Sequence, residues 1–252
     1  MPVELFHAEP ASNSLKVLQA LHEKGVDFVS HYIDLRSFKQ HDPAYLAVNP
    51  AGQVPALVHD GRVLTESTVI NEYVDAVFEG PALRPADEYL RGRMRIWTKF
   101  VDETFRPALS FLAWHRLIPG LVASLAPGEF EARLARIPLK EKRDKWRLAA
   151  TGGFGAHEIE TWRDQLADAV ARLEAGLEGQ DWLVGGAFSL ADIAMFAMTN
   201  GMPHGHPDLV NSQATPRAMA WLDRMRARPG VAAALAMPNH APAWAAPARE
   251  AH

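Results

Sequence analysis

The stretch from Asn49 to Leu57 has the clearest chemical potential in the sequence. It reads Asn-Pro-Ala-Gly-Gln-Val-Pro-Ala-Leu, so two prolines and a glycine build a rigid turn that leads into a strand. A strand that begins with a proline leaves the backbone N–H and C=O of the preceding residue, Val54, free to pair with an extended ligand. The pattern therefore indicates either a purely structural turn or a site that binds a peptide by strand addition.

A second polar group, Glu66 and Ser67, comes directly before an apolar helical pattern. Ser67 is a favourable N-cap, and the positive end of the helix that it would open attracts a carboxylate. Glu66 beside it could receive an ammonium group. The alternative is a helix cap that binds nothing.

The composition excludes several kinds of site. The chain of 252 residues has no cysteine, which excludes disulfides, thiolate zinc sites and a catalytic cysteine. Its 26 basic and 30 acidic residues give a net charge of −4, which argues against nucleic-acid binding. His204 and His206 have no third partner in their loop, so no metal site is expected. No secretory signal and no apolar run of membrane-spanning length are visible, so we expect a soluble, cytoplasmic protein.

The elements that must position these residues begin with a small mixed sheet in residues 1–80. Asp60-Gly61 between two apolar runs is the strongest hairpin signal, and Gly25 is expected to end the first helix. Strand and helix patterns alternate as βαβ, a short helix, then ββα, which predicts a mixed sheet with helices packed on it. The strands are expected at 3–6, 27–35, 56–59 and 62–64, and the later helices at 42–48 and 67–77.

Beyond a proline-containing loop, residues 88–235 are predicted to be all-helical. An apolar stripe at helical spacing runs from Met94 to Leu112, and Pro107 predicts a kink or break within it. The spacing of Ser189 and Asp192 predicts a capping box with a role in folding. Other helices are expected at 157–176, 189–200 and 215–228, with short amphipathic pieces in an extended 119–155 segment and a loosely held tail at 236–252.

Together these motifs resemble the glutathione transferases. The resemblance rests on the 49–57 turn, the hairpin with the following Glu66-Ser67, and a second run, Trp182-Leu183-Val184-Gly185-Gly186 followed by Phe188 to Ile193. It extends from Val3 to about Val231 and implies an α+β thioredoxin-like N-terminal domain followed by an all-α C-terminal domain. It further implies glutathione as co-substrate, no metal, and a homodimer.

The resemblance implies a role for each residue of the two motifs. Val54 would pair with the cysteinyl backbone of glutathione, with a cis peptide bond before Pro55, while Glu66 and Ser67 would bind the γ-glutamyl end. Positions implied to contact the glycyl end and the peptide backbone are Lys39, His41 and Gln53. For Lys39 and His41 the alternative is a solvated loop charge.

The residue that activates the glutathione thiol is sought at the start of the first helix. With no cysteine in the chain and no tyrosine near the first strand, the candidates are Ser12, Asn13 and Ser14. Adjacent side chains diverge by about 100° around a helix, so the three cannot all point at one sulfur. Ser14 is the first choice, because the serine classes of the family place theirs at this turn, and Asn13 is the second.

A closer resemblance is to the bacterial glutathione-dependent β-etherases, which cleave β-aryl ether dimers from lignin. The matching stretches include 11–16, 61–70, 83–87, 94–99, 101–103 and 214–222, with Ile137-Pro138 and Lys145-Trp146-Arg147 in the extended segment. Arg106-Pro107 departs from the bulkier residues expected there. The implied reaction is displacement by glutathione thiolate at the carbon bearing the aryloxy group, next to a ketone.

Such a substrate requires a wall for two aromatic rings. For any single aromatic residue here, a place in the core is the alternative. The expected wall consists of Trp97, Phe100, Val101, Phe111, Trp114, His115, Met195, Asn200 and His204. Two other functions stay open: a broad-specificity glutathione transferase or dehalogenase, and a non-catalytic transferase-like binding protein.

Overall fold

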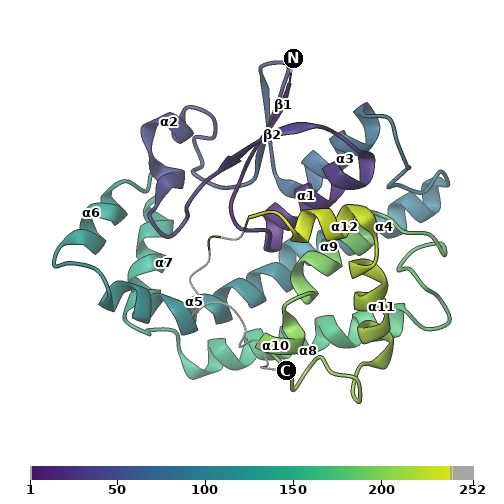
Figure 1. The fold of residues 1–252 in the computed structure, drawn as a ribbon. Helices are drawn as coiled ribbons and strands as arrows, with labels where there is room; N and C mark the ends of the chain where they lie inside the picture. Colours follow the sequence, from purple (N-terminus) through teal and green to yellow (C-terminus); the bar gives the residue numbers. More distant parts are fainter. Residues whose placement is uncertain (1, 239, 241–252) are drawn as a thin grey trace.

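The computed structural model describes residues 2–238 and 240, and it divides into a sheet-containing part and a helical part (Figure 1). The first part contains all four strands, and helices α4 to α12 make up the second. The predicted fold class, an α+β unit followed by an all-helical unit, is confirmed. Most of the predicted tail, 236–252, lies outside the described residues.

The sheet has the strand order β2-β1-β3-β4. Its strands are β1 (Val3–His7), β2 (Phe28–Tyr32), β3 (Ala56–His59) and β4 (Arg62–Thr65). β1 pairs in parallel with β2 and antiparallel with β3, and β3 pairs antiparallel with β4. Asp60 and Gly61 have φ of 52° and 72°, the left-handed values that a two-residue hairpin turn requires, so the predicted hairpin is confirmed.

Helices pack on this sheet and connect it to the helical part. They are α1 (Ser12–Lys24), the 3₁₀ turn Lys39–His41, α2 (Pro43–Leu46) and α3 (Ser67–Val77). α1 ends at Gly25, whose φ of 66° is left-handed, as predicted. Leu15, Leu18 and Leu21 of α1 are fully buried, because the helix packs against α3 on one side and against α9 and α12 on another. β2 is shorter than the predicted strand, since the chain turns after Tyr32.

The helical part begins with a long, interrupted rod. α4 ends at Phe100, a π-helical turn spans Val101–Phe105, and α5 continues from Arg106. Pro107 lies in the first turn of α5 and has no N–H to donate to the preceding turn, so the predicted kink or break takes the form of a change of helix type. The helices are α4 (Glu88–Phe100), α5 (Arg106–Ala123), α6 (Glu129–Ala135), α7 (Lys140–Ala150), α8 (Ala156–Gly176), α9 (Leu190–Thr199), α10 (Met202–Gly205), α11 (Pro216–Arg226) and α12 (Pro229–Leu235).

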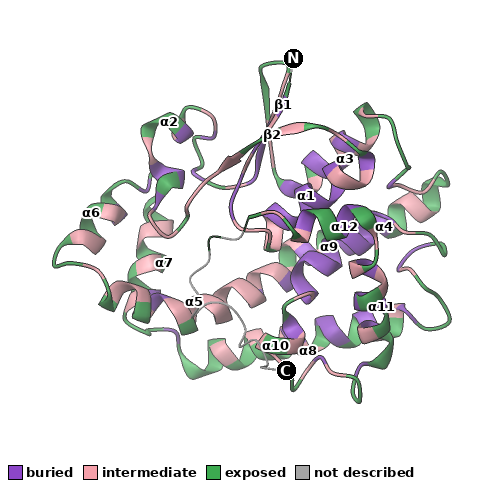
Figure 2. Ribbon diagram, viewed as in Figure 1, coloured by how far each residue is buried: buried purple, intermediate pink, exposed green. Residues whose placement is uncertain are grey.

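Helix α9 is buried along its whole length at the centre of the molecule (Figure 2). Its predicted capping box is confirmed: Ser189 Oγ accepts from Ala191 N at 3.3 Å, and Asp192 Oδ2 accepts from Ser189 N at 3.0 Å. Trp221 Nε1 also donates to the Asp192 carboxylate. Complete burial raises the pKa of Asp192 to about 6. The box therefore ties α9 to α11 as well as starting the helix.

The extended 119–155 segment folds back on the sheet-containing part, so that α6 and α7 lie below α2 in Figure 1. Phe38 is fully buried against Leu134 and Ile137 of this segment. Arg133 Nη1 and Arg136 Nη2 donate to backbone carbonyls of the 36–38 loop, at 2.6 and 2.7 Å. The segment thus encloses the space between the two parts. Within the described residues, no helix is long and apolar enough to cross a membrane.

Candidate functional site

A cavity of about 820 Å³ lies between the two parts. One wall is formed by the start of α1, the 49–55 turn and residues 65–67. The other is formed by the π-helical turn, α5 and α7. The motifs from Asn49 to Pro55 and at Glu66-Ser67 therefore face one enclosed volume.

The 49–55 turn is fixed from within. Asn49 Nδ2 donates to Gln53 O at 2.8 Å, the Tyr45 hydroxyl donates to the same carbonyl, and Ala51 N donates to Asn49 Oδ1. The peptide bond between Val54 and Pro55 is cis, as the resemblance implies. The backbone N–H and C=O of Val54 make no hydrogen bond to any described residue. This edge can therefore pair with an extended ligand.

Glu66 and Ser67 differ in detail from the sequence expectation. Ser67 is the first residue of α3 and not its N-cap; Glu66 occupies the cap position with a φ of 65°, a left-handed value that non-glycine residues rarely adopt. Neither side chain makes a hydrogen bond or ion pair with a described residue. An exposed carboxylate and a buried hydroxyl thus line the cavity at the positive end of α3.

Of the three candidates at the start of α1, only Asn13 lines the cavity. Ser14 is 3% exposed, and its Oγ accepts from Ala8 N at 3.1 Å. The Ser12 hydroxyl lies 3.8 Å from the sulfur of Met198. Asn13 is half-buried, and its side-chain amide makes no hydrogen bond with a described residue, so its Nδ2 group is available to donate to an anion. The geometry therefore singles out Asn13 and not Ser14, the first choice from the sequence.

The three residues expected near a glycyl carboxylate have different surroundings. Gln53 and His41 line the cavity, whereas Lys39 lies outside its lining, 3.1 Å from the Asp42 carboxylate. His41 is 5% exposed and packs so closely against Gly52 that a Cβ there would lie 2.4 Å from its Nδ1. Burial, and then the nearby Lys142 and Arg136, lowers the pKa of His41 to about 4. His41 is consequently neutral near pH 7 and supplies no cation.

The helical wall contains only part of the expected set. Phe111 and Trp114 of α5 line the cavity, together with Trp146 of α7, whose ring centroid is 4.8 Å from that of Trp114. The rest of this wall is mainly apolar, from Pro107, Leu117, Ile118, Leu121 and Ile137.

The remaining expected wall residues lie outside the cavity lining. Trp97 and Phe100 pack beneath the Arg172 guanidinium, and the amide oxygen of Asn200 accepts from Arg226 Nε at 3.0 Å. Trp97 and Phe100 of α4, and Asn200 directly after α9, thus take part in packing within the helical part. The same lining also excludes Val101 and Met195, which are fully buried, and His115 and His204.

Several lining residues were not singled out from the sequence. Gln40 and Arg36 come from the loop before α2, and Lys142 comes from α7. The stretch around Lys145 and Trp146 contributes to the resemblance, but it does not specify which face of α7 meets the cavity. The available signal was the basic and aromatic face of that helix.

An ion pair with a buried lysine and a half-buried aspartate joins the two parts beside Ser67. Lys16 of α1 is fully buried, and its ammonium lies 2.8 Å from both Asp102 Oδ1 and Thr68 Oγ1. Thr68 Oγ1 also donates to Asp102 Oδ2 at 2.6 Å. Burial lowers the pKa of Lys16, and the Asp102 carboxylate opposes that shift. Asp102 also lines the cavity, so the network fixes the domain junction where the ligand would sit.

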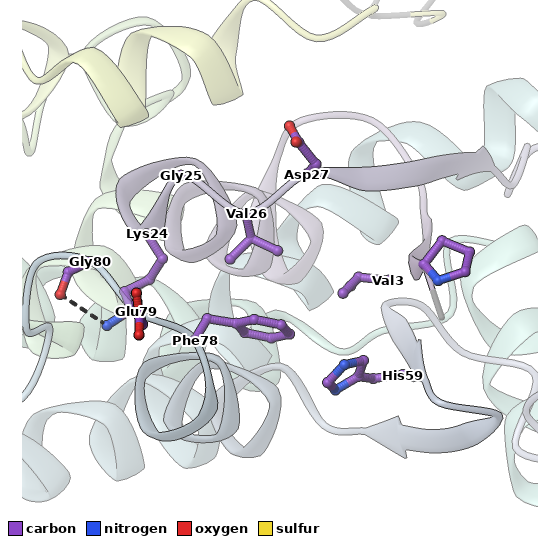
Figure 3. A pocket seen from close by; sticks show the side chains of 10 residues that line it. Val3, Lys24, Gly25, Val26, Asp27, His59, Phe78, Glu79 and Gly80 are labelled. Atoms are coloured by element: carbon purple, nitrogen blue, oxygen red, sulfur yellow. Dashed lines mark hydrogen bonds between the residues drawn. The ribbon is translucent and has the colours of Figure 1, made fainter.

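A second, shallower hollow of about 510 Å³ lies at the opposite end of the sheet (Figure 3). Its lining includes Val3, Val26, Phe78 and His59, and Lys24 Nζ donates to the Gly80 carbonyl at 3.4 Å. The described residues that line it do not form a recognisable catalytic group. Among the described residues, no cluster of three or more histidine, aspartate or glutamate side chains could hold a metal ion.

Comparison with known proteins agrees with this geometry. The family model described as "Glutathione S-transferase, N-terminal domain" matches residues 11–77, and the "Glutathione S-transferase, C-terminal domain" matches residues 133–229. Protein LigF of Sphingobium sp. (strain NBRC 103272 / SYK-6) is 44% identical over 237 residues, which cover 92% of each chain. Glutathione S-transferase 3 of Zea mays is 30% identical over 90% of each chain.

A solved structure shares the whole architecture. The crystal structure of the beta-etherase LigF from Sphingobium sp. strain SYK-6 superimposes with a TM-score of 0.88 at 42% identity. The match covers 93% of this chain and 98% of that one. With both domain types matched in order and a polar, strand-edge site at their junction, this chain belongs to the glutathione S-transferase family.

Proposed function

We propose that this protein cleaves the β-aryl ether bond of lignin-derived α-keto aryl ether dimers with glutathione. The sulfur–carbon bond forms as the carbon–oxygen bond of the aryl ether breaks. The thiol proton leaves on ionisation, and the departing phenolate takes up a proton from water. The products are a glutathione thioether and a phenol.

The observation that carries this proposal is the asymmetry of the cavity. One wall presents a free strand edge at Val54 with Glu66 and Ser67, and the other presents Phe111, Trp114 and Trp146. A peptide thiol and a bis-aromatic ether need these two different surfaces. The likeness to LigF, whose structure is described as that of a beta-etherase, supports the same substrate class.

Glutathione would lie along the N-terminal wall. Val54 would pair with its cysteinyl backbone, Glu66 with its ammonium group and Ser67 with its γ-glutamyl carboxylate. Lowering a thiol pKa from ~8.5 by ~2 units requires about 2.7 kcal/mol of preferential thiolate binding. One hydrogen bond to an anion contributes about 1.5–3 kcal/mol, so Asn13 with the positive end of α1 is sufficient.

The aromatic substrate would lie against α5 and α7. Alignment of the thiolate behind the scissile bond can contribute about 7–11 kcal/mol in ideal cases, so holding both rings is the main task of this wall. The neighbouring ketone eases displacement at the carbon. Of the Arg106-Pro107 pair, where bulkier residues were expected, both line the cavity, and the small side chains of Pro107 and Ser110 suit the volume of two rings.

Two other functions make different demands on the same cavity. A broad transferase or dehalogenase would need the glutathione wall but not a long aromatic wall. A non-catalytic binding protein would need neither a thiolate donor nor an enclosed second wall. Trp146, brought to the cavity by the 119–155 segment, favours the aryl ether reading over both.

The test is release of a guaiacol-type phenol from a racemic β-aryl ether ketone, with and without glutathione. We expect phenol release that depends on glutathione and yields a thioether of matching mass. Conversion of a halogenated substrate with no release from the ether would establish the alternative transferase function. Calorimetry showing no binding of glutathione would exclude all glutathione-dependent functions.

We also infer a homodimer and a cytoplasmic location. Large apolar side chains are exposed on α3 and α4, among them Val69 at 52% and Ile96 at 53%, and a second copy could cover them. Glutathione is an abundant cytosolic thiol, which favours that compartment. Light scattering at micromolar concentration should give twice the mass of one chain, and Ile96→Glu should reduce it; a monomeric wild type would refute the dimer.

A further inference from the structure

The basic residues of α7 fall into two groups. Lys140, Arg143 and Arg147 are each bonded to a carboxylate or to backbone carbonyls. Lys142 and Lys145 make no hydrogen bond or ion pair with any described residue, although both line the cavity. The two side chains without an anionic partner are therefore the two that face the proposed ligand.

These two ammonium groups share one face of the helix. They are three residues apart, so their charges repel each other across one helical turn. Lys142 is half-buried, and burial lowers its pKa; Glu141 and Glu66 oppose that shift, and Lys145 adds to it. Lys145 Nζ lies 5.4 Å from the Phe111 ring centroid, at the aromatic wall. A bound anion would relieve the repulsion and replace the lost hydration of Lys142.

The carboxylates of the cavity wall do not pair with these two ammonium groups. Asp102 is engaged by Lys16 at 2.8 Å, and Glu66 faces the position proposed for an ammonium group. Glu141 also lines the cavity and opposes the lowering of the Lys142 pKa, but its side chain is exposed and makes no ion pair with a described residue. His41, which is close enough for Lys142 to lower its pKa, is neutral. Among the described residues, no carboxylate forms an ion pair with Lys142 or Lys145, so both ammonium groups are available to a bound anion.

The glycyl carboxylate of glutathione would meet no unpaired cation among the described residues of the N-terminal wall, where Arg36 lies 3.9 Å from the Glu9 carboxylate. The γ-glutamyl carboxylate and ammonium of glutathione face Ser67 and Glu66 in the proposed function, on which this step rests. Its glycyl carboxylate would lie toward Gln53 and His41, where Lys39 points away to Asp42. Lys142 is the cavity-lining cation that acts on His41 most strongly.

We propose that Lys142 and Lys145 form a carboxylate-binding pair in the helical wall of the cavity. The glycyl carboxylate of glutathione is one source of that group, and a carboxylate on the aromatic substrate is the other. The extended 119–155 segment thus takes part in ligand recognition and does more than cover the site.

The experiment compares each acid with its ester. Wild-type protein, the Lys142→Met/Lys145→Met double variant and the Lys140→Met control are titrated by calorimetry with glutathione and with its glycyl ethyl ester. We expect wild type and control to prefer the acid by roughly tenfold, and the double variant to bind both alike. Lys142→Arg/Lys145→Arg should restore the preference, which a folding defect would not allow.

A second titration identifies the source. It uses an aryl ether ketone with a ring carboxylate and the corresponding methyl ester, each added to the glutathione-loaded protein. Loss of acid preference in this series alone assigns the pair to the aromatic substrate. Unchanged acid-to-ester ratios in both series would overturn the carboxylate-binding pair. Absence of glutathione binding by wild type would instead refute the proposed function.

Discussion

The two walls of the cavity are built in different ways. The N-terminal wall consists of backbone edges and short polar side chains, held by bonds within a few residues, such as Asn49 to Gln53. The helical wall consists of large side chains from α5 and α7, and its shape depends on how those helices pack. The first wall is suited to one invariable peptide, whereas the second sets the shape of the space left for the aromatic rings.

Substitution of Ser67 is expected to give the largest effect that tests this division of roles between the two walls. Ser67→Ala should weaken glutathione binding by roughly 10- to 150-fold, because a hydrogen bond to a carboxylate contributes about 1.5–3 kcal/mol. Since this contact is remote from the reacting sulfur, turnover at saturating glutathione should change little. Calorimetry and steady-state kinetics measure the two quantities.

The matched control is Ser110→Ala on the opposite wall. Ser110 lines the cavity from α5, so its removal should leave glutathione affinity unchanged. A large fall in kcat for Ser67→Ala with unchanged KM for glutathione would contradict the division of roles.

His41 should make the N-terminal wall sensitive to acid. Its pKa is about 4 in the folded protein and 6.5 when unfolded, so below pH 6.5 the unfolded chain binds the proton more readily. The free energy of unfolding should therefore fall as the pH drops from 6.5 toward 4, by about 2 kcal/mol at pH 5 from this group. Urea unfolding of wild type and His41→Gln at pH 7 and pH 5 measures this contribution.

The variant should lose less stability than wild type between those two pH values. His204→Gln is the control: His204 lies on α10 outside the cavity, and this variant measures how replacing a different imidazole changes the free energy of unfolding at the two pH values. Parallel pH profiles for wild type and His41→Gln would show that His41 is not held neutral by its packing against Gly52.

The third prediction concerns the residue at the start of α1 that donates a hydrogen bond to the glutathione thiolate. Asn13→Ala should raise the pKa of bound glutathione and lower kcat/KM by roughly tenfold at pH 6.5, with a smaller loss at high pH where the thiol ionises unaided. Ser14→Ala should leave the thiol pKa unchanged, because Ser14 lies outside the cavity lining. The pH–rate profile of each variant and of the pair provides the measurement.

Two results would change this assignment. A shifted thiol pKa in Ser14→Ala alone would restore Ser14 as the donor. Full activity with an unshifted pKa in the double variant would assign the anion to backbone amides at the start of α1.

The same contrast explains what the sequence could predict. The hairpin at Asp60-Gly61, the end of α1 at Gly25 and the Ser189 capping box follow from local backbone preferences, and all three are confirmed. The fold class could be predicted because alternating strand and helix patterns end near residue 80 and only helical patterns follow. The domain bounds 1–80 and 88–235 themselves remain predictions.

The sequence was a poorer guide to which side chains point into the cavity. Trp97 and Phe100 have the residue types of an aromatic wall, but they lie against Arg172 of α8 and outside the cavity lining. Trp146 reaches the cavity only because α7 folds back between the two parts, and no local pattern specifies that contact. Ser14 is the first choice on family resemblance alone, but its hydroxyl accepts from Ala8 N, because the side-chain directions in the first turn of α1 depend on where the preceding loop ends.

The smallest expected effect separates true wall residues from aromatic packing. Phe111→Leu keeps an apolar side chain but removes a ring at the cavity, so KM for the aryl ether should rise about two- to tenfold, as expected for loss of one aromatic contact. Glutathione affinity should not change. Phe100→Leu is the matched control, because Phe100 is also half-buried but lies outside the lining. Its substitution should lower the thermal midpoint while leaving KM for the ether unchanged. If Phe100→Leu raised that KM and Phe111→Leu did not, the aromatic rings would bind against α4, and the wall expected from the sequence would replace the one assigned from the structure.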